Sequence, residues 1–169
     1  MEQIYADIFP KTQLSYPVMI ARFIGAIIFG AVIGIEREKK DRPAGLKTHI
    51  LVSLAAAVFA VISIESVHMP GLSDEQVRID PLRVVEAVTA GVAFLAAGTI
   101  VLTRGEVHGL TTGASLWLAG AIGLALGFGY WLIALFATVG AFFVLMGIGQ
   151  LEVMRNRRRK PKDRGAGEE

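Results

Sequence analysis

Residues 30–53 read GAVIGIEREKKDRPAGLKTHILVS, and this stretch decides the fold of the chain. An apolar run ends at Ile35, and seven consecutive charged residues follow, from Glu36 to Arg42. A Pro-Ala-Gly turn at residues 43–45 comes next, and a second apolar run begins at once. This order is typical of a transmembrane helical hairpin whose charged corner lies in the headgroup and water layer. Such a corner suits either a topology anchor or a binding site.

The composition indicates a small integral membrane protein. The chain has 169 residues, of which 53% are hydrophobic, and a mean hydropathy of +0.55. Soluble domains are about 45–50% apolar, with their apolar residues dispersed, whereas here these residues are concentrated in long runs. The sequence contains no cysteine, which excludes disulfide frameworks, thiolate metal sites and thiol nucleophiles. No basic segment precedes the first apolar run, so a cleaved signal peptide is not expected.

Each apolar run is close to the roughly 20 residues that cross a bilayer core. We predict an all-α bundle of five transmembrane helices with a basic, disordered cytoplasmic tail. The predicted spans are residues 17–35, 46–64, 84–102, 110–126 and 130–151, and the tail is residues 152–169. Thirteen Lys and Arg residues fall on the side of the tail and four on the other side. Because basic residues near span ends mark the cytoplasmic side, we predict the N-terminus outside and the C-terminus inside.

The first two predicted hairpins resemble each other. A shift of 64 residues places residues 44–48 (AGLKT) over residues 108–112 (HGLTT). Both hairpins run from outside to inside and back, which predicts parallel copies related by an axis along the membrane normal. Each Gly-Leu-x-Thr turn would begin a helix at the cytoplasmic face, where helix N-termini favour an anion or a carboxylate. We therefore expect N–H groups or hydroxyls of the second hairpin to hold Glu36.

The charged corner allows two interpretations. In the first, Glu36–Lys40 and Glu38–Arg42 are i,i+4 pairs on a solvated helix end. In the second, Glu36 is buried below the headgroups as part of a site, because an intramembrane acid needs a partner and indicates function. The second interpretation predicts that Glu36→Ala weakens the bundle while Glu38→Ala, closer to water, has little effect.

Hydroxyl and imidazole groups flank both turns of the repeat. Thr48 and Thr112 are candidate caps of the helices that follow. His49 and His108 lack the spacing of zinc ligands, so we expect interfacial histidines and no metal site. The candidate cytoplasmic site comprises Glu36, Arg37, Glu38, Arg42, Gly45, Thr48, His49, Thr111 and Thr112.

On the outer side, Arg22 and Glu86 occupy equivalent depths in the first and third predicted spans. We expect them to form a partly buried ion pair. Asp80 is the expected cap of the third helix, with Pro81 at its first position and Arg83 beside it. Small residues let membrane helices approach closely, and the predicted packing positions are Gly30, Gly34, Gly91, Gly98 and Gly123.

Residues 34–38 (GIERE) and 42–49 (RPAGLKTH) resemble the signature of the MgtC/SapB family of bacterial inner-membrane proteins. Residues 80–83 (DPLR), Gly91, residues 94–98 (FLAAG) and residues 109–117 (GLTTGASLW) continue the resemblance in order. It covers about residues 19–126. The departures are Lys47, where the family favours Arg, Ala93 and Ala96, where it favours Gly, Gly113, where it favours Ala, and Ala87, where Gln is frequent.

The resemblance implies a five-helix inner-membrane protein connected with magnesium limitation, acid stress or survival in host cells. It also implies a regulator that acts on membrane partners, including the proton-translocating ATP synthase. Larger family members carry a cytoplasmic ACT-like domain after the fifth helix; here a basic tail follows, so we expect the membrane module alone.

Taken with the residues, the resemblance favours a non-enzymatic regulator that works through helix contacts and its cytoplasmic corner. The alternative is a small oligomeric transporter or channel for Mg²⁺ or an anion. We expect no cofactor. The expected partners are anionic headgroups at the basic tail, other membrane proteins and a second copy of the chain. Nucleic acid is not expected, because the basic tail lacks interleaved aromatic residues.

Overall fold

The computed structural model describes residue 4 and residues 10–67, 80–103 and 106–159. It contains five helices: α2 (Tyr16–Lys39), α3 (Leu46–Ser66), α4 (Pro81–Gly98), α5 (Leu110–Gly127) and α6 (Trp131–Arg159). A short antiparallel hairpin of β1 (Val101–Thr103) and β2 (Glu106–His108) joins α4 to α5. The prediction of an all-α membrane bundle of five helices is confirmed, with this small hairpin added to it.

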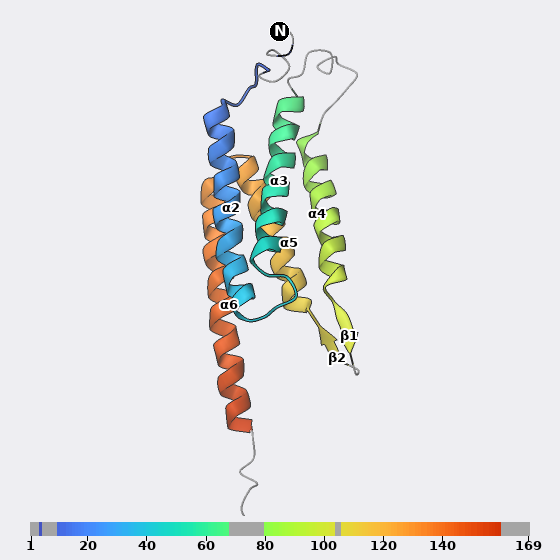
Figure 1. Cartoon of the computed structure of the whole chain (residues 1–169), viewed down its shortest axis with the longest axis vertical. Helices are drawn as coiled ribbons and strands as arrows, with labels where there is room; N and C mark the ends of the chain where they lie inside the picture. Colours follow the sequence, from blue (N-terminus) through green and yellow to red (C-terminus); the bar gives the residue numbers. More distant parts are fainter. Residues whose placement is uncertain (1–3, 5–9, 68–79, 104–105, 160–169) are drawn as a thin grey trace, which may run out of the picture.

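Successive helices run in opposite directions (Figure 1). Consequently the α2–α3 corner, the β1–β2 hairpin and the C-terminal end of α6 lie at the same end of the bundle, as five membrane crossings require. The hairpins α2–α3 and α4–α5 also run in the same sense, which agrees with the predicted parallel repeat. By length and composition α2, α3 and α5 are each apolar enough to cross a membrane, and the part of α6 from Trp131 to Gly147 is a shorter apolar segment.

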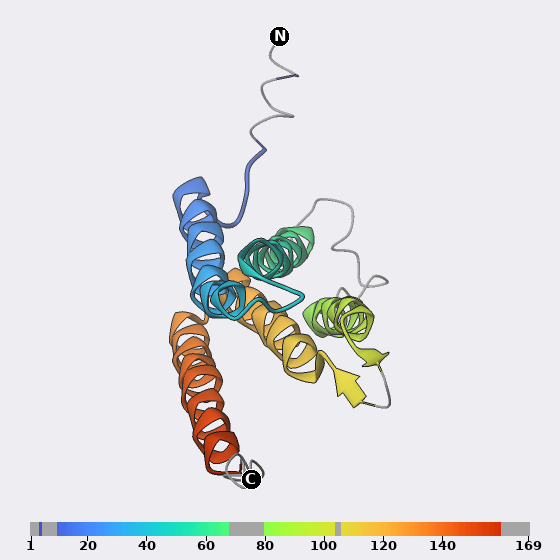
Figure 2. The same ribbon diagram turned by 60° about the horizontal axis from the view of Figure 1, so that its bottom comes forward.

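The helix α5 occupies the centre of the bundle. It contacts α2, α3, α4 and α6, and Figure 2 shows it between the α2–α6 side and the α3–α4 side. Small and branched apolar residues fill the space around it: Ala26, Ile33, Ala57, Ile122, Leu126 and Ala134 form one cluster of buried residues. Such small side chains allow close contact between helices, which holds a bundle together in lipid.

Three of the five predicted packing glycines lie at close helix contacts. A Cβ added at Gly30 would lie 2.9 Å from the backbone oxygen of His49, and one at Gly34 would lie 2.7 Å from the Cα of Leu46. At Gly123 it would overlap the backbone oxygen of Ser53. These three predictions are confirmed.

The predictions for the remaining two packing glycines are wrong. A Cβ at Gly91 or Gly98 would meet no atom within 4 Å. The physical reason is that both glycines lie on exposed positions of α4, the helix that contacts α3 and α5 but lies apart from α2 and α6 in Figure 2.

The third helix begins and ends earlier than the predicted span of residues 84–102. Asp80 caps it as predicted, because its Oδ1 accepts a hydrogen bond of 2.9 Å from the Leu82 N–H and Pro81 follows. The helix ends at Gly98, where the Thr99 hydroxyl donates to the Ala96 carbonyl. The apolar residues after Thr99 form β1 instead of a last helical turn.

The last helix continues beyond the predicted end at residue 151, since α6 reaches Arg159. The first part of the predicted disordered tail is therefore helical. Residues 160–169 of that tail lie outside the described residues.

The predicted pair between Arg22 and Glu86 is not formed. Arg22 Nη1 donates instead to the Gly127 carbonyl at 2.6 Å, at the C-terminal end of α5, and Glu86 is exposed on α4. The reason is the arrangement of the helices: α3 and α5 lie between α2 and α4 (Figures 1 and 2). Arg83 is likewise exposed near the start of α4.

Candidate functional site

The corner between α2 and α3 is a tight link of residues 40–45. The α2 helix ends at Lys39, and the Arg42 N–H donates back to the Arg37 carbonyl at 3.1 Å. Asp41 takes a positive φ of 50°, a left-handed conformation that Asp adopts more readily than most residues. This reversal brings the charged end of α2 against the start of α3.

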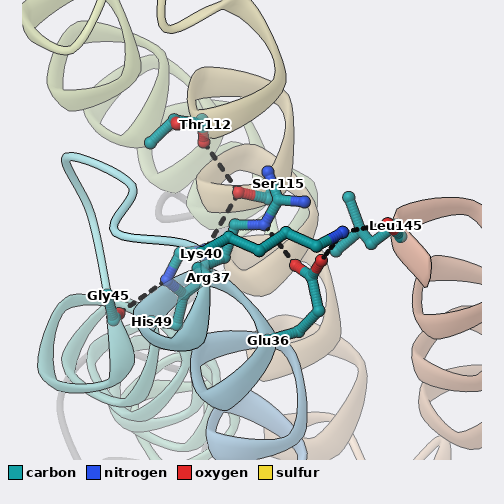
Figure 3. A network of polar contacts seen from close by, with 8 residues as sticks. All are labelled: Glu36, Arg37, Lys40, Gly45, His49, Thr112, Ser115 and Leu145. Atoms are coloured by element: carbon teal, nitrogen blue, oxygen red, sulfur yellow. Dashed lines mark hydrogen bonds and ion pairs between the residues drawn. The ribbon is translucent and has the colours of Figure 1, made fainter. Parts of the chain in front are cut away.

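Glu36 lies in a buried ion cluster at the end of α2 (Figure 3). Its carboxylate is 2.6 Å from Arg37 Nε and 2.6 Å from Lys40 Nζ. Glu36 and Arg37 are only 6% and 3% exposed, and buried charges persist only when they are paired. Lys40 Nζ also donates to the Leu145 carbonyl at 3.0 Å. The cluster therefore connects the end of α2 with α6.

The partners of Glu36 differ from those expected. The i,i+4 pair with Lys40 is formed, and Glu36 is buried as the second interpretation requires. However, both partners come from the end of its own helix and from the residue that follows it. The prediction that groups of the second hairpin hold Glu36 is wrong, because adjacent cations already occupy both carboxylate oxygens.

Glu38 caps the α3 helix. Its Oε2 accepts a hydrogen bond of 2.9 Å from the Leu46 N–H, and a Cβ added at Gly45 would overlap this oxygen. The predicted Glu38–Arg42 pair is not formed, and Arg42 is exposed. The predicted Thr48 cap is also wrong, since the N-cap position is Gly45 and Thr48 is exposed within the first turns of the helix.

His49 joins α3 to α5. It is 0% exposed, with Nδ1 2.8 Å from the Gly45 carbonyl and Nε2 3.0 Å from Ser115 Oγ. Ser115 Oγ in turn lies 2.8 Å from the Thr112 carbonyl and donates to it. His49 also interacts electrostatically with Arg37 and Glu36, so this chain of contacts lies beside the ion cluster (Figure 3).

The acceptors in this series of hydrogen bonds determine which atoms carry the protons. A carbonyl only accepts, so His49 Nδ1 must carry a proton. A hydroxyl has a single hydrogen. When Ser115 Oγ donates this hydrogen to the Thr112 carbonyl, His49 Nε2 must carry a proton and donate it to Oγ. When Nε2 carries no proton, the hydroxyl must instead donate its hydrogen to Nε2. Rotation of one hydroxyl therefore satisfies both the neutral and the cationic imidazole.

The second Gly-Leu-x-Thr turn has a different conformation from the first. Gly109 is the N-cap of α5 with φ of 89°, which glycine adopts without strain, whereas Gly45 has φ of −102°. Thr111 is exposed, and Thr112 is buried but does not cap α5 as predicted. Ser115 was missed by the sequence analysis; its spacing of three residues from Thr112 places both on one helix face.

Within residues 10–67, 80–103 and 106–159, no group of three or more His, Cys, Asp or Glu side chains could hold a metal ion. Within the corner, one buried carboxylate is paired with two cations. The buried members of the corner fix α2, α3, α5 and α6 relative to one another, and its outer residues Lys39, Asp41, Arg42, Lys47 and Thr48 are exposed.

Comparison with known proteins places this bundle in a family. Residues 23–154 match the model of the MgtC family. The chain belongs to the MgtC family. It is therefore a multi-pass membrane protein, as the apolar helices indicate. No solved structure matches the chain.

Three curated relatives illustrate the similarity of this MgtC family chain. It is 35% identical over 137 residues to the "Putative magnesium transporter YhiD" of Escherichia coli, covering 79% of this chain and 63% of the relative. It is 38% identical over 125 residues to protein SapB of Bacillus subtilis, covering 73% and 52%. It is 36% identical over 130 residues to protein MgtC of Salmonella typhimurium, covering 76% and 51%. The chain thus spans between half and two thirds of the length of these relatives.

Proposed function

We propose that this MgtC family protein is a non-enzymatic regulator of other membrane proteins in the bacterial inner membrane. The observation that carries the proposal is the state of Glu36, whose carboxylate oxygens face Arg37 and Lys40 at 2.6 Å each. Mg²⁺ is held by carboxylate oxygens that can reach the ion. A carboxylate already neutralised by two cations favours a structural role at a contact surface over a role as a cation ligand.

The surface offered to a partner is the cytoplasmic corner. Lys39, Arg42 and Lys47 are exposed there around the buried cluster. Lys40 connects the end of α2 with α6 and His49 connects α3 with α5, so these side chains lie on helix ends that are joined to their neighbours. Prearranged charged groups of this kind favour specific docking and rapid association.

Two kinds of partner fit this surface and the basic tail. Other membrane proteins are the first, and the resemblance of the sequence to the MgtC/SapB family nominates the proton-translocating ATP synthase. Anionic headgroups are the second, since each basic residue near an anionic surface contributes about 1 kcal/mol.

A second candidate function is ion transport by an oligomer, for Mg²⁺ or an anion. It is favoured by the magnesium-transporter name of the Escherichia coli relative. If the transported ion is Mg²⁺, Glu36 must exchange its internal cations for this ion during each cycle, which predicts that Glu36→Gln abolishes Mg²⁺ flux.

Reconstitution distinguishes the two functions. Purified protein in vesicles that contain a Mg²⁺-sensitive dye should show no flux above that of protein-free vesicles. Flux that is lost in Glu36→Gln would overturn the regulator proposal and support transport.

Photo-crosslinking in living cells tests the contact surface. A photoreactive residue at the exposed position Lys47 should capture a membrane protein, whereas the same residue at the exposed position Ile62, near the opposite end of α3, should not capture it. The same partner captured at both positions, or at neither, would contradict docking through the corner.

A further inference from the structure

The α4 helix borders an apolar groove that the functions proposed above do not use. The groove has a volume of about 520 Å³ and lies between α3 and α4. Its walls are apolar side chains such as Val52 and Phe59 on α3 and Val88 and Leu95 on α4. Arg83, near the start of α4, is the charged residue that lines it.

The groove matches one leaflet of a bilayer in length. Arg83 and Leu95 mark its extent along α4, and twelve residues at about 1.5 Å each give roughly 18 Å. Half of a hydrocarbon core of about 30 Å is about 15 Å. The groove therefore extends from the helix end at the headgroup level to the region of the bilayer midplane.

The lining of the groove suits an acyl chain, because apart from Arg83 every residue that lines it is apolar. The groove is also open at Gly91, where an added Cβ would meet no atom within 4 Å.

The charge lies at the end where a headgroup would be. Arg83 is exposed, and within the described residues it takes part in no ion pair. Of the acidic residues that the structure describes near Arg83, Asp80 precedes α4 and accepts a hydrogen bond from the Leu82 N–H, and Glu86 does not line the groove. A guanidinium offers paired N–H donors that suit a phosphate group.

We propose that this groove is a binding site for one anionic glycerophospholipid of the outer leaflet. One acyl chain lies between α3 and α4, and the phosphate contacts Arg83. The bound chain completes the packing of α4 on the side that the protein itself leaves open. The proposal is independent of the regulatory function.

Native mass spectrometry of the full-length protein, released from nanodiscs of mixed phosphatidylglycerol and phosphatidylcholine, tests the site. We expect one retained phosphatidylglycerol per chain, several-fold preferred over phosphatidylcholine. Arg83→Gln should remove the preference, while Lys11→Gln, at another exposed basic residue of the outer side, should keep it. Equal retention of both lipids by the unaltered protein would overturn the proposal.

Variants with larger side chains in the groove test whether the acyl chain binds there. Gly91→Leu on α4 and Ala55→Leu on α3 both place side chains in the groove and should each abolish retention of the lipid. Gly140→Leu on α6 is the matched control, because a Cβ there also meets no atom within 4 Å, and it should retain the lipid. Retention unchanged in both filling variants would place the lipid elsewhere, and a dimer that Gly91→Leu dissociates would assign the groove to a second copy. Either result would contradict the proposal.

Discussion

At the scale of single residues, Gly123 is the glycine of α5 that leaves the least room for a side chain against α3. A Cβ there would overlap the backbone oxygen of Ser53 and lie 2.9 Å from the Cβ of Ala56. Backbone cannot rotate away as a side chain can, so Gly123→Ala must push the two helices apart. We expect a loss of about 1–3 kcal/mol in the free energy of unfolding, seen as a lower melting temperature in detergent. Gly140→Ala, in open space, should melt at or above the temperature of the unaltered protein.

Glu36 and Glu38 are two residues apart, and the structure predicts that both contribute to stability. Glu36→Ala leaves the nearly buried Arg37 without its partner, and breaking a buried ion pair in this way costs about 3–5 kcal/mol. Glu38→Ala removes the cap of α3, which costs about 1 kcal/mol. Thermal melting should therefore rank the unaltered protein above Glu38→Ala and Glu38→Ala above Glu36→Ala.

Arg42→Ala is the control for this pair, because Arg42 is exposed within the same corner and should melt like the unaltered protein. The ranking departs from the sequence-based expectation that Glu38→Ala has little effect. Equal melting of Glu38→Ala and Arg42→Ala would show that the cap contributes nothing.

Side-chain contacts within one helix end were predictable, and side-chain hydrogen bonds between helices were not. The Glu36–Lys40 pair and the Asp80 cap follow from spacing within one helix end. The bond from Glu38 to Leu46 depends on the left-handed Asp41, and the link from His49 to Ser115 depends on how α3 packs against α5. Neither arrangement leaves a periodic pattern in the sequence.

At the scale of elements, Arg22 on α2 serves as a cap for the end of α5. Its Nη1 donates to the Gly127 carbonyl, which lies at the negative end of the helix dipole. Arg22→Leu should leave this carbonyl unpaired and lower the free energy of unfolding by about 1–3 kcal/mol. Arg22→Lys should recover part of the loss, because a cation near a helix C-terminus remains favourable.

Differential scanning fluorimetry of the three proteins in one detergent measures this order. Glu86→Gln distinguishes the two possible partners of Arg22, since Glu86 is exposed and should be replaceable without effect on melting. A loss in Glu86→Gln equal to that in Arg22→Leu would restore the ion pair that the sequence suggested.

The existence of the helices was predictable from the length of each apolar run, and their ends were less so. The end of α4 was predicted four residues late, at residue 102, because residues 100–102 (IVL) are as apolar as the helix before them. Apolarity cannot distinguish a last helical turn from a short strand. The pairing of Val101 with His108 across the hairpin decides for the strand.

At the scale of the whole molecule, the alternation of helix direction makes the topology testable. The α2–α3 corner and the end of α6 lie together, and the start of α2 lies at the opposite end (Figure 1). Basic residues are concentrated on the side of the corner, which the positive-inside rule assigns to the cytoplasm. The same distribution could not have revealed the apolar groove between α3 and α4, since the groove depends on how these two helices pack against each other.

Cysteine labelling in intact cells checks the orientation, and the sequence offers a clean background because it contains no cysteine. Lys11→Cys and Arg42→Cys both place a thiol at an exposed position, on opposite ends of α2. A membrane-impermeant maleimide should label Lys11→Cys in intact cells and Arg42→Cys only after the membrane is permeabilised. Because α2 runs from one position to the other, labelling of Arg42→Cys from outside would invert the bundle and move the proposed contact surface out of the cytoplasm. Labelling of both positions in intact cells would show that α2 does not cross the membrane, and the five-span topology would then be wrong.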